Sequence, residues 1–218
     1  MMKPFTAGLV SLTIVFASVG TVHSDPVPLE TRLNLYGEAQ VVDAELGWSQ
    51  YNWRWTGRVH DMSGSVDGES LGNNGTTIAV GRADVSFASS GRGSVSFSDT
   101  GFIWAIFDQG AWASLSESFW SYTFTVADEH VFSVKYASGV RRNSADDLPL
   151  QGFTVSVYQD GDAIHVEDLD LGTSGRVRVR LEPGQTYTVF ISPIADFSTS
   201  SPDLGISTMW GQFDWKIH

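Results

Sequence analysis

The segment from Gly152 to Pro193 constrains the fold of this chain more than any other stretch. It reads GFTVSVYQDGDAIHVEDLDLGTSGRVRVRLEPGQTYTVFISP. Apolar and polar residues alternate along four stretches, which is the period of a β-strand with one buried face. Asp160-Gly161 predicts a two-residue hairpin turn between the first two stretches, and Pro183-Gly184 predicts a type II turn before the fourth. The segment therefore predicts a four-stranded antiparallel meander.

Alternating stretches of the same kind recur through the rest of the chain, separated by segments rich in glycine and serine. The pattern predicts an all-β protein, an antiparallel β-sandwich that is jelly-roll-like, because hairpins and long crossings suit that architecture. Segments 62–75 and 137–151 are expected to be loops, and segment 108–119 has mixed signals that allow a short helix. We expect a single domain over residues 25–218.

The N-terminal segment has the features of a secretory signal peptide. Lys3 precedes an apolar run from Phe5 to Val22, and Val22 and Ser24 occupy the positions that signal peptidase reads. Residues 1–24 are therefore predicted to be removed. A membrane anchor is the alternative, but the run contains Thr, Ser and Gly and falls short of the roughly 20 residues that a span needs. We expect a protein that is secreted, extracellular or periplasmic, with no membrane span after cleavage.

Composition narrows the classes of function. The chain has no cysteine, so it forms no disulfide and offers no thiol nucleophile or thiolate metal site. Its net charge of −12 argues against nucleic acid as a partner, because phosphates select basic surfaces. Eight Trp and 13 Phe can supply the core that must hold a disulfide-free exported protein together.

One candidate ligand-binding site is an aromatic row early in the chain. Within WSQYNWRWTG, Tyr51, Trp53 and Trp55 alternate with polar residues and share one face if this stretch is a strand. Such a face could stack on sugar rings. The alternative is that the three rings are buried in the core, as aromatic residues on strands commonly are.

A second candidate ligand-binding site is a row of three cations, Arg176, Arg178 and Arg180, on one face of a predicted strand. Guanidinium groups bind carboxylates well, so this row could hold an anionic polymer such as a uronate-rich polysaccharide. The alternative is a solvated face whose cations pair with groups across strands. Those groups would be Glu167, Asp168 and His165.

The acidic residues near the predicted hairpin are candidates for a calcium site. Asp160, Asp162 and Asp168 could place oxygens around Ca²⁺, which takes six to eight oxygen ligands. The chain has no EF-hand loop and no glycine-aspartate repeat, and aspartates are expected at a hairpin turn for conformational reasons alone. No other cofactor is expected.

No catalytic motif stands out in the sequence. There is no Gly-x-Ser-x-Gly elbow and no histidine spacing typical of a zinc site. A glycosidase needs two carboxylates about 5–10 Å apart. Single glutamates are available, and the sequence leaves open which of them pair in space: Glu38, Glu45, Glu117 and Glu129.

The part of the chain from Tyr122 to Pro193 resembles the small β-sandwich modules of secreted bacterial proteins, notably the pre-peptidase C-terminal type. The resemblance rests on YTFTVADEHVFSVKY, FTVSVYQDGDAIHV and VRVRLEPGQTYTVFIS, in which a strand pair, a strand with an Asp-Gly turn and a hairpin follow one another. It implies an exported accessory module, often one that binds matrix or polysaccharide, and no catalytic residues. Because a single domain is expected over residues 25–218, we expect no attached protease or glycosidase domain, which is a departure from the family.

Three functions are therefore expected in order. The first is a secreted, non-enzymatic β-sandwich that binds carbohydrate, with a polysaccharide or a cell-surface molecule as its partner. The second is a structural or adhesive component of the cell surface or matrix. The third is a jelly-roll polysaccharide hydrolase or lyase.

Overall fold

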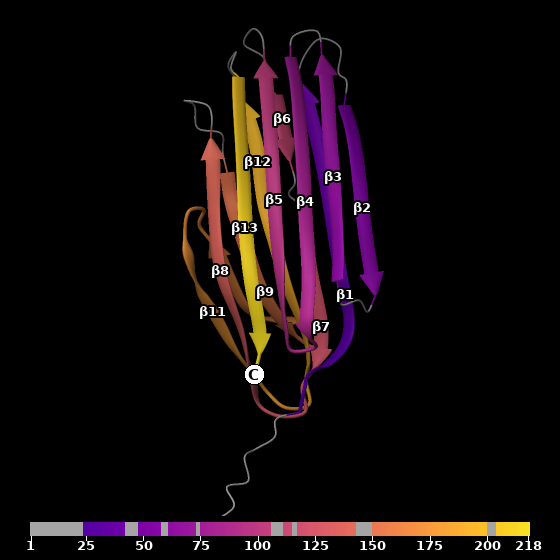
Figure 1. Ribbon diagram of the computed structural model, residues 1–218, viewed down its shortest axis with the longest axis vertical. Helices are drawn as coiled ribbons and strands as arrows, with labels where there is room; N and C mark the ends of the chain where they lie inside the picture. Colours follow the sequence, from indigo (N-terminus) through magenta and orange to yellow (C-terminus); the bar gives the residue numbers. More distant parts are fainter. Residues whose placement is uncertain are drawn as a thin grey trace, which may run out of the picture.

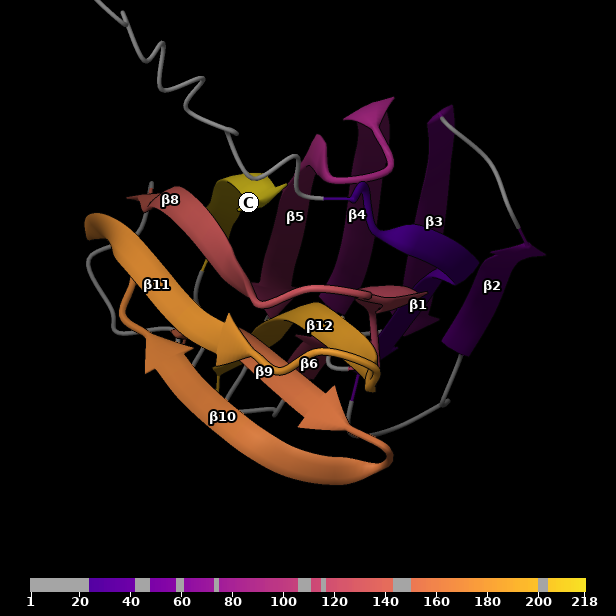
Figure 2. The same cartoon turned by 90° about the horizontal axis from the view of Figure 1, so that it is seen from below.

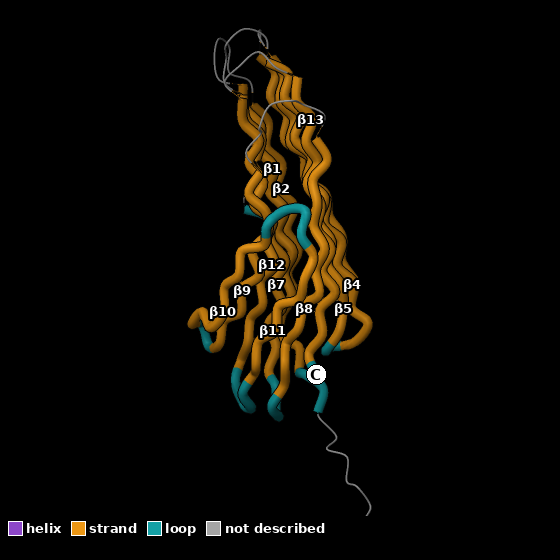
Figure 3. Tube along the Cα trace, turned by 90° about the vertical axis from the view of Figure 1, so that its left-hand side faces the viewer, coloured by secondary structure: helices purple, strands orange, loops and turns teal. Residues whose placement is uncertain are grey.

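The computed structural model describes residues 24–41, 48–57, 61–72, 75–105, 111–114, 117–142, 150–199 and 204–218. Within them all regular structure is β-strand, and the strands form two antiparallel sheets, which confirms the predicted all-β sandwich (Figures 1 and 3). A search of these same residues finds no helix long and apolar enough to cross a membrane.

The first sheet, sheet A, contains seven strands in the order β10-β9-β12-β6-β1-β2, and β7 also lies between β12 and β1. Its edges are β10 and β2. The strand bounds are β1 Val27–Val41, β2 Trp48–Gly57, β6 Ala111–Ser114, β7 Phe119–Thr125, β9 Leu150–Gln159, β10 Asp162–Leu169 and β12 Thr186–Thr199.

The second sheet, sheet B, contains six strands in the order β11-β8-β13-β5-β4-β3. Its edges are β11 and β3. The strand bounds are β3 Asp61–Gly72, β4 Gly75–Ser89, β5 Arg92–Ala105, β8 His130–Arg142, β11 Ser174–Leu181 and β13 Leu204–Ile217.

Strands β6 and β7 act as one interrupted strand in the middle of sheet A. Both pair with β1 on one side and with β12 on the other. Between them the chain leaves the ladder, and the Ser118 hydroxyl takes over part of the pairing by accepting a hydrogen bond from the Tyr36 backbone N–H at 3.0 Å. Phe119, the first residue of β7, follows directly after this interruption.

The core between the sheets is aromatic around Trp215, near the C-terminal end of β13. That end of the chain is marked C in Figures 1 and 2. The rings of Trp120 and Trp215 are stacked with their centroids 5.7 Å apart, and Tyr122 stacks on Trp120 at 6.2 Å. Phe87 meets Trp215 edge to face at 5.2 Å. Large buried rings supply the hydrophobic area that stabilises a chain without disulfides.

Among the side chains that the structure describes, the inner face of sheet B contains one buried acid. Asp99 of β5 is fully buried, and Gly81 and Met209 lie opposite it on the neighbouring strands. Among the described residues neither of its carboxyl oxygens has a hydrogen-bond partner, and burial raises its pKa well above the ordinary value. The fold therefore favours the neutral, protonated form of Asp99.

The predicted four-stranded meander is wrong beyond its first hairpin. Strands β9 and β10 pair as expected through Asp160 and Gly161, which both have positive φ. The next strand, β11, instead crosses to sheet B and pairs with β8, and β12 returns to sheet A beside β9. Ser138 of β8 fixes the first crossing, because its N–H donates to the Thr173 carbonyl at 2.9 Å. Gly184, with φ +76°, keeps the expected turn conformation but joins strands of different sheets.

Three local predictions are also corrected. Segment 62–75 was expected to be a loop, yet most of it is β3, which pairs with β4 along its whole length. The possible short helix in 108–119 is replaced, in its described residues, by β6 and the start of β7. The expected loop 137–151 is strand at both ends, and residues 143–149 lie outside the described part.

Candidate functional site

Three aromatic side chains form a row on the outer face of sheet A. They come from adjacent strands: Tyr158 from β9, Phe190 from β12 and Phe119 from β7. Phe190 meets Tyr158 edge to face, with centroids 5.4 Å apart, and meets Phe119 at 5.7 Å. All three rings are half-buried, so each keeps part of its surface in contact with solvent.

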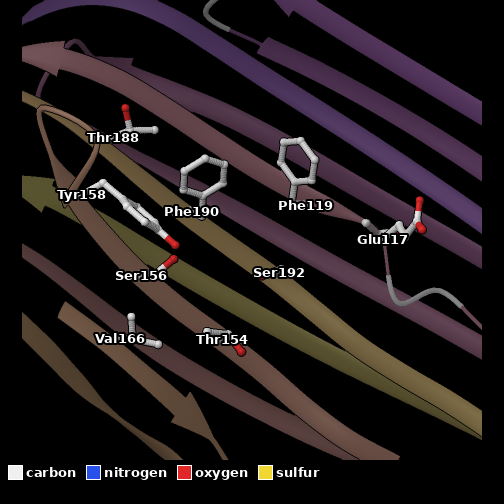
Figure 4. A pocket seen from close by; sticks show the side chains of 11 residues that line it. Glu117, Phe119, Thr154, Ser156, Tyr158, Val166, Thr188, Phe190 and Ser192 are labelled. Carbon is white, nitrogen blue, oxygen red and sulfur yellow. The ribbon is translucent and has the colours of Figure 1, made fainter. Parts of the chain in front are cut away.

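The row lines a shallow hollow of about 620 Å³. Figure 4 shows the rings crossing the face from Tyr158 to Phe119, with Thr188 on one side, Thr154 and Val166 on the other, and Glu117 beyond Phe119. Five residues with aliphatic hydroxyl groups line the hollow beside the rings, namely Ser118, Thr154, Ser156, Thr188 and Ser192. Ser118 and Ser156 are buried, so the other three are the accessible ones. Val166 adds apolar surface and is 57% exposed. The hollow thus combines exposed apolar area with groups that donate and accept hydrogen bonds.

Strand alternation explains why these rings point outward. On β9 the residues Val155 and Val157 are fully buried, so Tyr158 faces the opposite side of the sheet. On β12 Val189 and Ile191 are fully buried, which turns Phe190 outward in the same way. The rings are diagonal neighbours across the strands, a separation that aromatic side chains can bridge.

Neighbouring hydrogen bonds hold the polar side chains of this face. Thr154 donates to Asp168 Oδ1 of β10 at 2.7 Å. Thr188 and Thr123 share a hydrogen bond of 3.0 Å between their hydroxyl oxygens. Glu117 is exposed, and its backbone carbonyl accepts a hydrogen bond from Asn34 at 2.8 Å. It is the one carboxylate in the described lining of the hollow.

The arginine row lies on β11, the edge strand of sheet B, and all three side chains are exposed. Its predicted partners are wrong, because His165, Glu167 and Asp168 lie on β10 of the other sheet. On β10, His165 contacts Glu167 at 3.2 Å. Arg180 of the arginine row pairs instead with Glu129, at 2.7 Å.

The predicted aromatic site is on β2, the other edge of sheet A. Its register sets Trp55 opposite Leu33 and Trp53 opposite Leu35, and both leucines are fully buried. The side chains of Tyr51, Trp53 and Trp55 lie outside the described ones, so ligand binding by them stays a prediction.

The three aspartates proposed for calcium do not come together. Asp160 and Asp162 flank the β9–β10 turn, whereas Asp168 lies near the far end of β10, about 20 Å away at the rise of a β-strand. Asp160 Oδ1 instead accepts a hydrogen bond from the Thr186 N–H at 3.3 Å. Among the described residues no group of three or more acidic, histidine or cysteine side chains could hold a metal ion.

Sequence reasoning missed the aromatic row of sheet A, although a signal for it is present. In QGFTVSVYQ and TYTVFISP, Tyr158 and Phe190 fall out of phase with the alternation of the buried residues. When two strands each carry an aromatic residue at an outward position, the pattern indicates a surface site. The sequence does not show that β9 and β12 are neighbours, which follows from the sheet order.

Comparison with known proteins adds little to this picture. No family model matches the chain, and no curated protein matches it. Among solved structures, the chain is similar to the GH31 alpha-xylosidase from Xanthomonas citri at 11% identity and a TM-score of 0.21, over 72% of this chain and 32% of that one. The chain thus spans about a third of that enzyme, and a likeness this low carries no argument about fold or activity.

Proposed function

We propose that this protein is a non-enzymatic β-sandwich that binds carbohydrate on the outer face of sheet A. The observation that carries the proposal is the row Tyr158–Phe190–Phe119 in an open, hydroxyl-bordered hollow. A sugar ring has apolar C–H faces and a rim of hydroxyls. The aromatic rings offer a surface on which the C–H faces can pack. The Thr and Ser hydroxyls and Glu117 offer hydrogen-bond partners for the sugar hydroxyls.

The row has a structural interpretation as well, since cross-strand aromatic pairs stabilise sheets. Stability alone does not require a hollow, however, and packing the same rings between the sheets would stabilise the fold more. A solvent-exposed apolar patch rimmed by polar groups is typical of a ligand site. These features support binding.

The number of carboxylates in the described lining of the hollow favours binding without cleavage over hydrolysis. Glycosidases act through two carboxylates that flank the scissile bond. The described lining supplies only Glu117. We therefore expect a bound glycan to be released unchanged, which a reducing-sugar assay on the same polymers checks.

The test is retention on a panel of neutral polysaccharides, namely cellulose, xylan, mannan, galactan, chitin and starch. We expect the protein to bind at least one of them, and Phe190→Ala with Tyr158→Ala to weaken that binding about tenfold or more, because two aromatic contacts are lost. Trp210→Ala is the matched control, since Trp210 is an exposed aromatic residue on the opposite sheet. Its binding should stay within about twofold.

A parallel variant separates the two aromatic candidates. Trp53→Ala with Trp55→Ala changes the predicted site on β2 and leaves the hollow intact. Loss of binding in this variant alone would move the site to β2. No binding to any polymer of the panel, or full binding by both double variants, would contradict the proposal.

A further inference from the structure

A second hollow lies on the outer face of sheet B and has a different character. It has a volume of about 570 Å³ and crosses five strands. Four cationic side chains line it, Arg92 of β5, Lys135 of β8, Arg176 of β11 and Lys216 of β13. We call this feature the cationic groove.

The sheet register brings these cations close together. Lys216 lies directly opposite Arg92, and Lys135 lies directly opposite Arg176. Positions paired in this way are about 5 Å apart. Like charges directly opposite one another destabilise a sheet. Asp214 of β13, directly opposite Lys135 on its other side, is the one carboxylate that the register places beside these pairs and that lines the groove.

The positive potential extends beyond the groove. Burial lowers the pKa of His218, and Lys216, Arg178 and Arg176 lower it further by repulsion. Arg178 is on the same face of β11 as Arg176, so it adds a fifth cation at the rim. The cations of the groove therefore act electrostatically on His218, which does not line it.

Ordinary explanations account for only part of the cluster. None of its five cations belongs to an ion pair of the described residues, whereas Arg180 on the same strand pairs with Glu129. Charges on edge strands prevent unwanted sheet pairing, which would explain Arg176 and Arg178. It does not explain Arg92, Lys135 and Lys216, which are on inner strands. The whole chain carries a net charge of −12, so composition does not produce the cluster either.

We propose that the cationic groove is a second binding site, and that it takes an acidic polysaccharide. Cations supply partners for carboxylate or sulfate groups. Between the cations the groove presents the hydroxyls of Ser86, Ser94 and Ser133 and a single carboxylate, Asp214. Asp214 can accept hydrogen bonds from sugar hydroxyls, which an acidic polysaccharide presents between its charges and a DNA backbone does not.

The test compares charged and neutral forms of the same polymer. Polygalacturonate is paired with its methyl ester and dextran sulfate with dextran, and binding is measured by calorimetry at rising salt concentration. The variant Lys135→Gln, Arg176→Gln, Lys216→Gln removes three cations of the groove. The control Arg54→Gln, Arg82→Gln, Arg141→Gln removes three exposed cations outside it, so both variants have the same net charge.

We expect at least one acidic polymer to bind, its neutral form not to bind, and the affinity to fall as salt rises. The groove variant should lose about tenfold or more, because three charge contacts are removed, and the control should stay within about threefold. The substituted side chains are exposed, and a thermal unfolding scan of each variant checks that the fold is kept.

Several outcomes would overturn the proposal. They are the absence of binding to both acidic polymers, equal losses in the two variants, and tighter binding to double-stranded DNA than to either polymer. Self-association that the groove variant abolishes would assign the groove to the acidic surface of a second copy instead. The Phe190 and Tyr158 variants leave the groove unchanged, so this site and the proposed one on sheet A succeed or fail separately.

Discussion

The indole N–H of Trp120 donates a hydrogen bond to the hydroxyl of Thr31 at 3.2 Å, deep in the aromatic core. Thr31 in turn donates to the Ser121 carbonyl at 3.0 Å. One hydroxyl thus satisfies a buried donor and a buried acceptor on β7 from its position on β1. It links the two strands through their side chains as well as through the backbone ladder.

Thr31→Val should therefore destabilise the protein by about 1–3 kcal/mol, because it leaves two buried polar groups without a partner. Thr31→Ser keeps the hydroxyl and loses one methyl group, so its cost should be about 1 kcal/mol. The free energy of unfolding in urea measures both. A serine variant as unstable as the valine variant would show that the hydroxyl contributes nothing.

Asp99 should make the stability of the fold depend on pH. Burial raises its folded pKa above the unfolded value, so the folded state holds its proton more tightly. The stabilisation is complete below the unfolded pKa, about 4, and is lost as pH rises through the folded pKa. In the wild type, the free energy of unfolding should fall over this range.

Asp99→Asn removes the titrating group with little change in shape. We expect the difference in unfolding free energy between this variant and the wild type to shift in favour of the variant as pH rises. Urea midpoints at a series of pH values from 4 to 9, an interval chosen to span the unfolded pKa and beyond, measure the shift. Two parallel curves would show that the carboxyl does not titrate differently on folding.

Local geometry was predictable from sequence, and the partner of each strand was not. Asp160-Gly161 predicted a hairpin turn because the backbone conformation of such a turn depends on its own two residues, and both have the expected positive φ. Pro183-Gly184 also predicted the right local conformation. Which strands the turn joins depends on whether β11, with its buried residues Val177 and Leu181, is part of sheet A or of sheet B. The contacts that decide this are long-range.

The candidate site also has a part that was predictable from sequence and a part that depends on which strands are neighbours. The out-of-phase positions of Tyr158 and Phe190 can be recognised in their own strands. Their encounter with Phe119, a residue distant in sequence, follows from the placement of β7 beside β12. The cationic groove is a stronger case, because Arg176 was recognised as part of a row on one strand, whereas Arg92 and Lys216 join it only through the order of sheet B.

Two glycines beneath tryptophan rings should respond differently to an added methyl group. A Cβ on Gly93 would lie 2.3 Å from the Ser86 carbonyl oxygen and 2.6 Å from the ring of Trp215, and both are held in place by the fold. A Cβ on Gly139 would lie 2.7 Å from the ring of Trp210, which is 39% exposed.

Gly93→Ala should therefore cost about 3 kcal/mol or more, because backbone or core must shift to admit the methyl group. Gly139→Ala should cost about 1 kcal/mol or less, because an exposed ring can swing away. Chemical denaturation of the two variants side by side measures the contrast. Similar losses in both would mean that Trp210 is as fixed as Trp215.

Tyr187 ties the turn between β11 and β12 to the strand that follows it. Its hydroxyl accepts a hydrogen bond from the Glu182 backbone N–H at 2.6 Å and lies 3.3 Å from the Glu182 carbonyl. The ring is fully buried against Phe124. Tyr187→Phe keeps this packing and leaves the backbone groups of the turn without their partner, so it should cost about 1–2 kcal/mol.

Tyr158→Phe is the matched control, because no hydrogen bond of the Tyr158 hydroxyl is present among the described residues. The unfolding free energy of this variant should change by less than about 0.5 kcal/mol. Equal effects of the two substitutions would show that the turn does not depend on the Tyr187 hydroxyl.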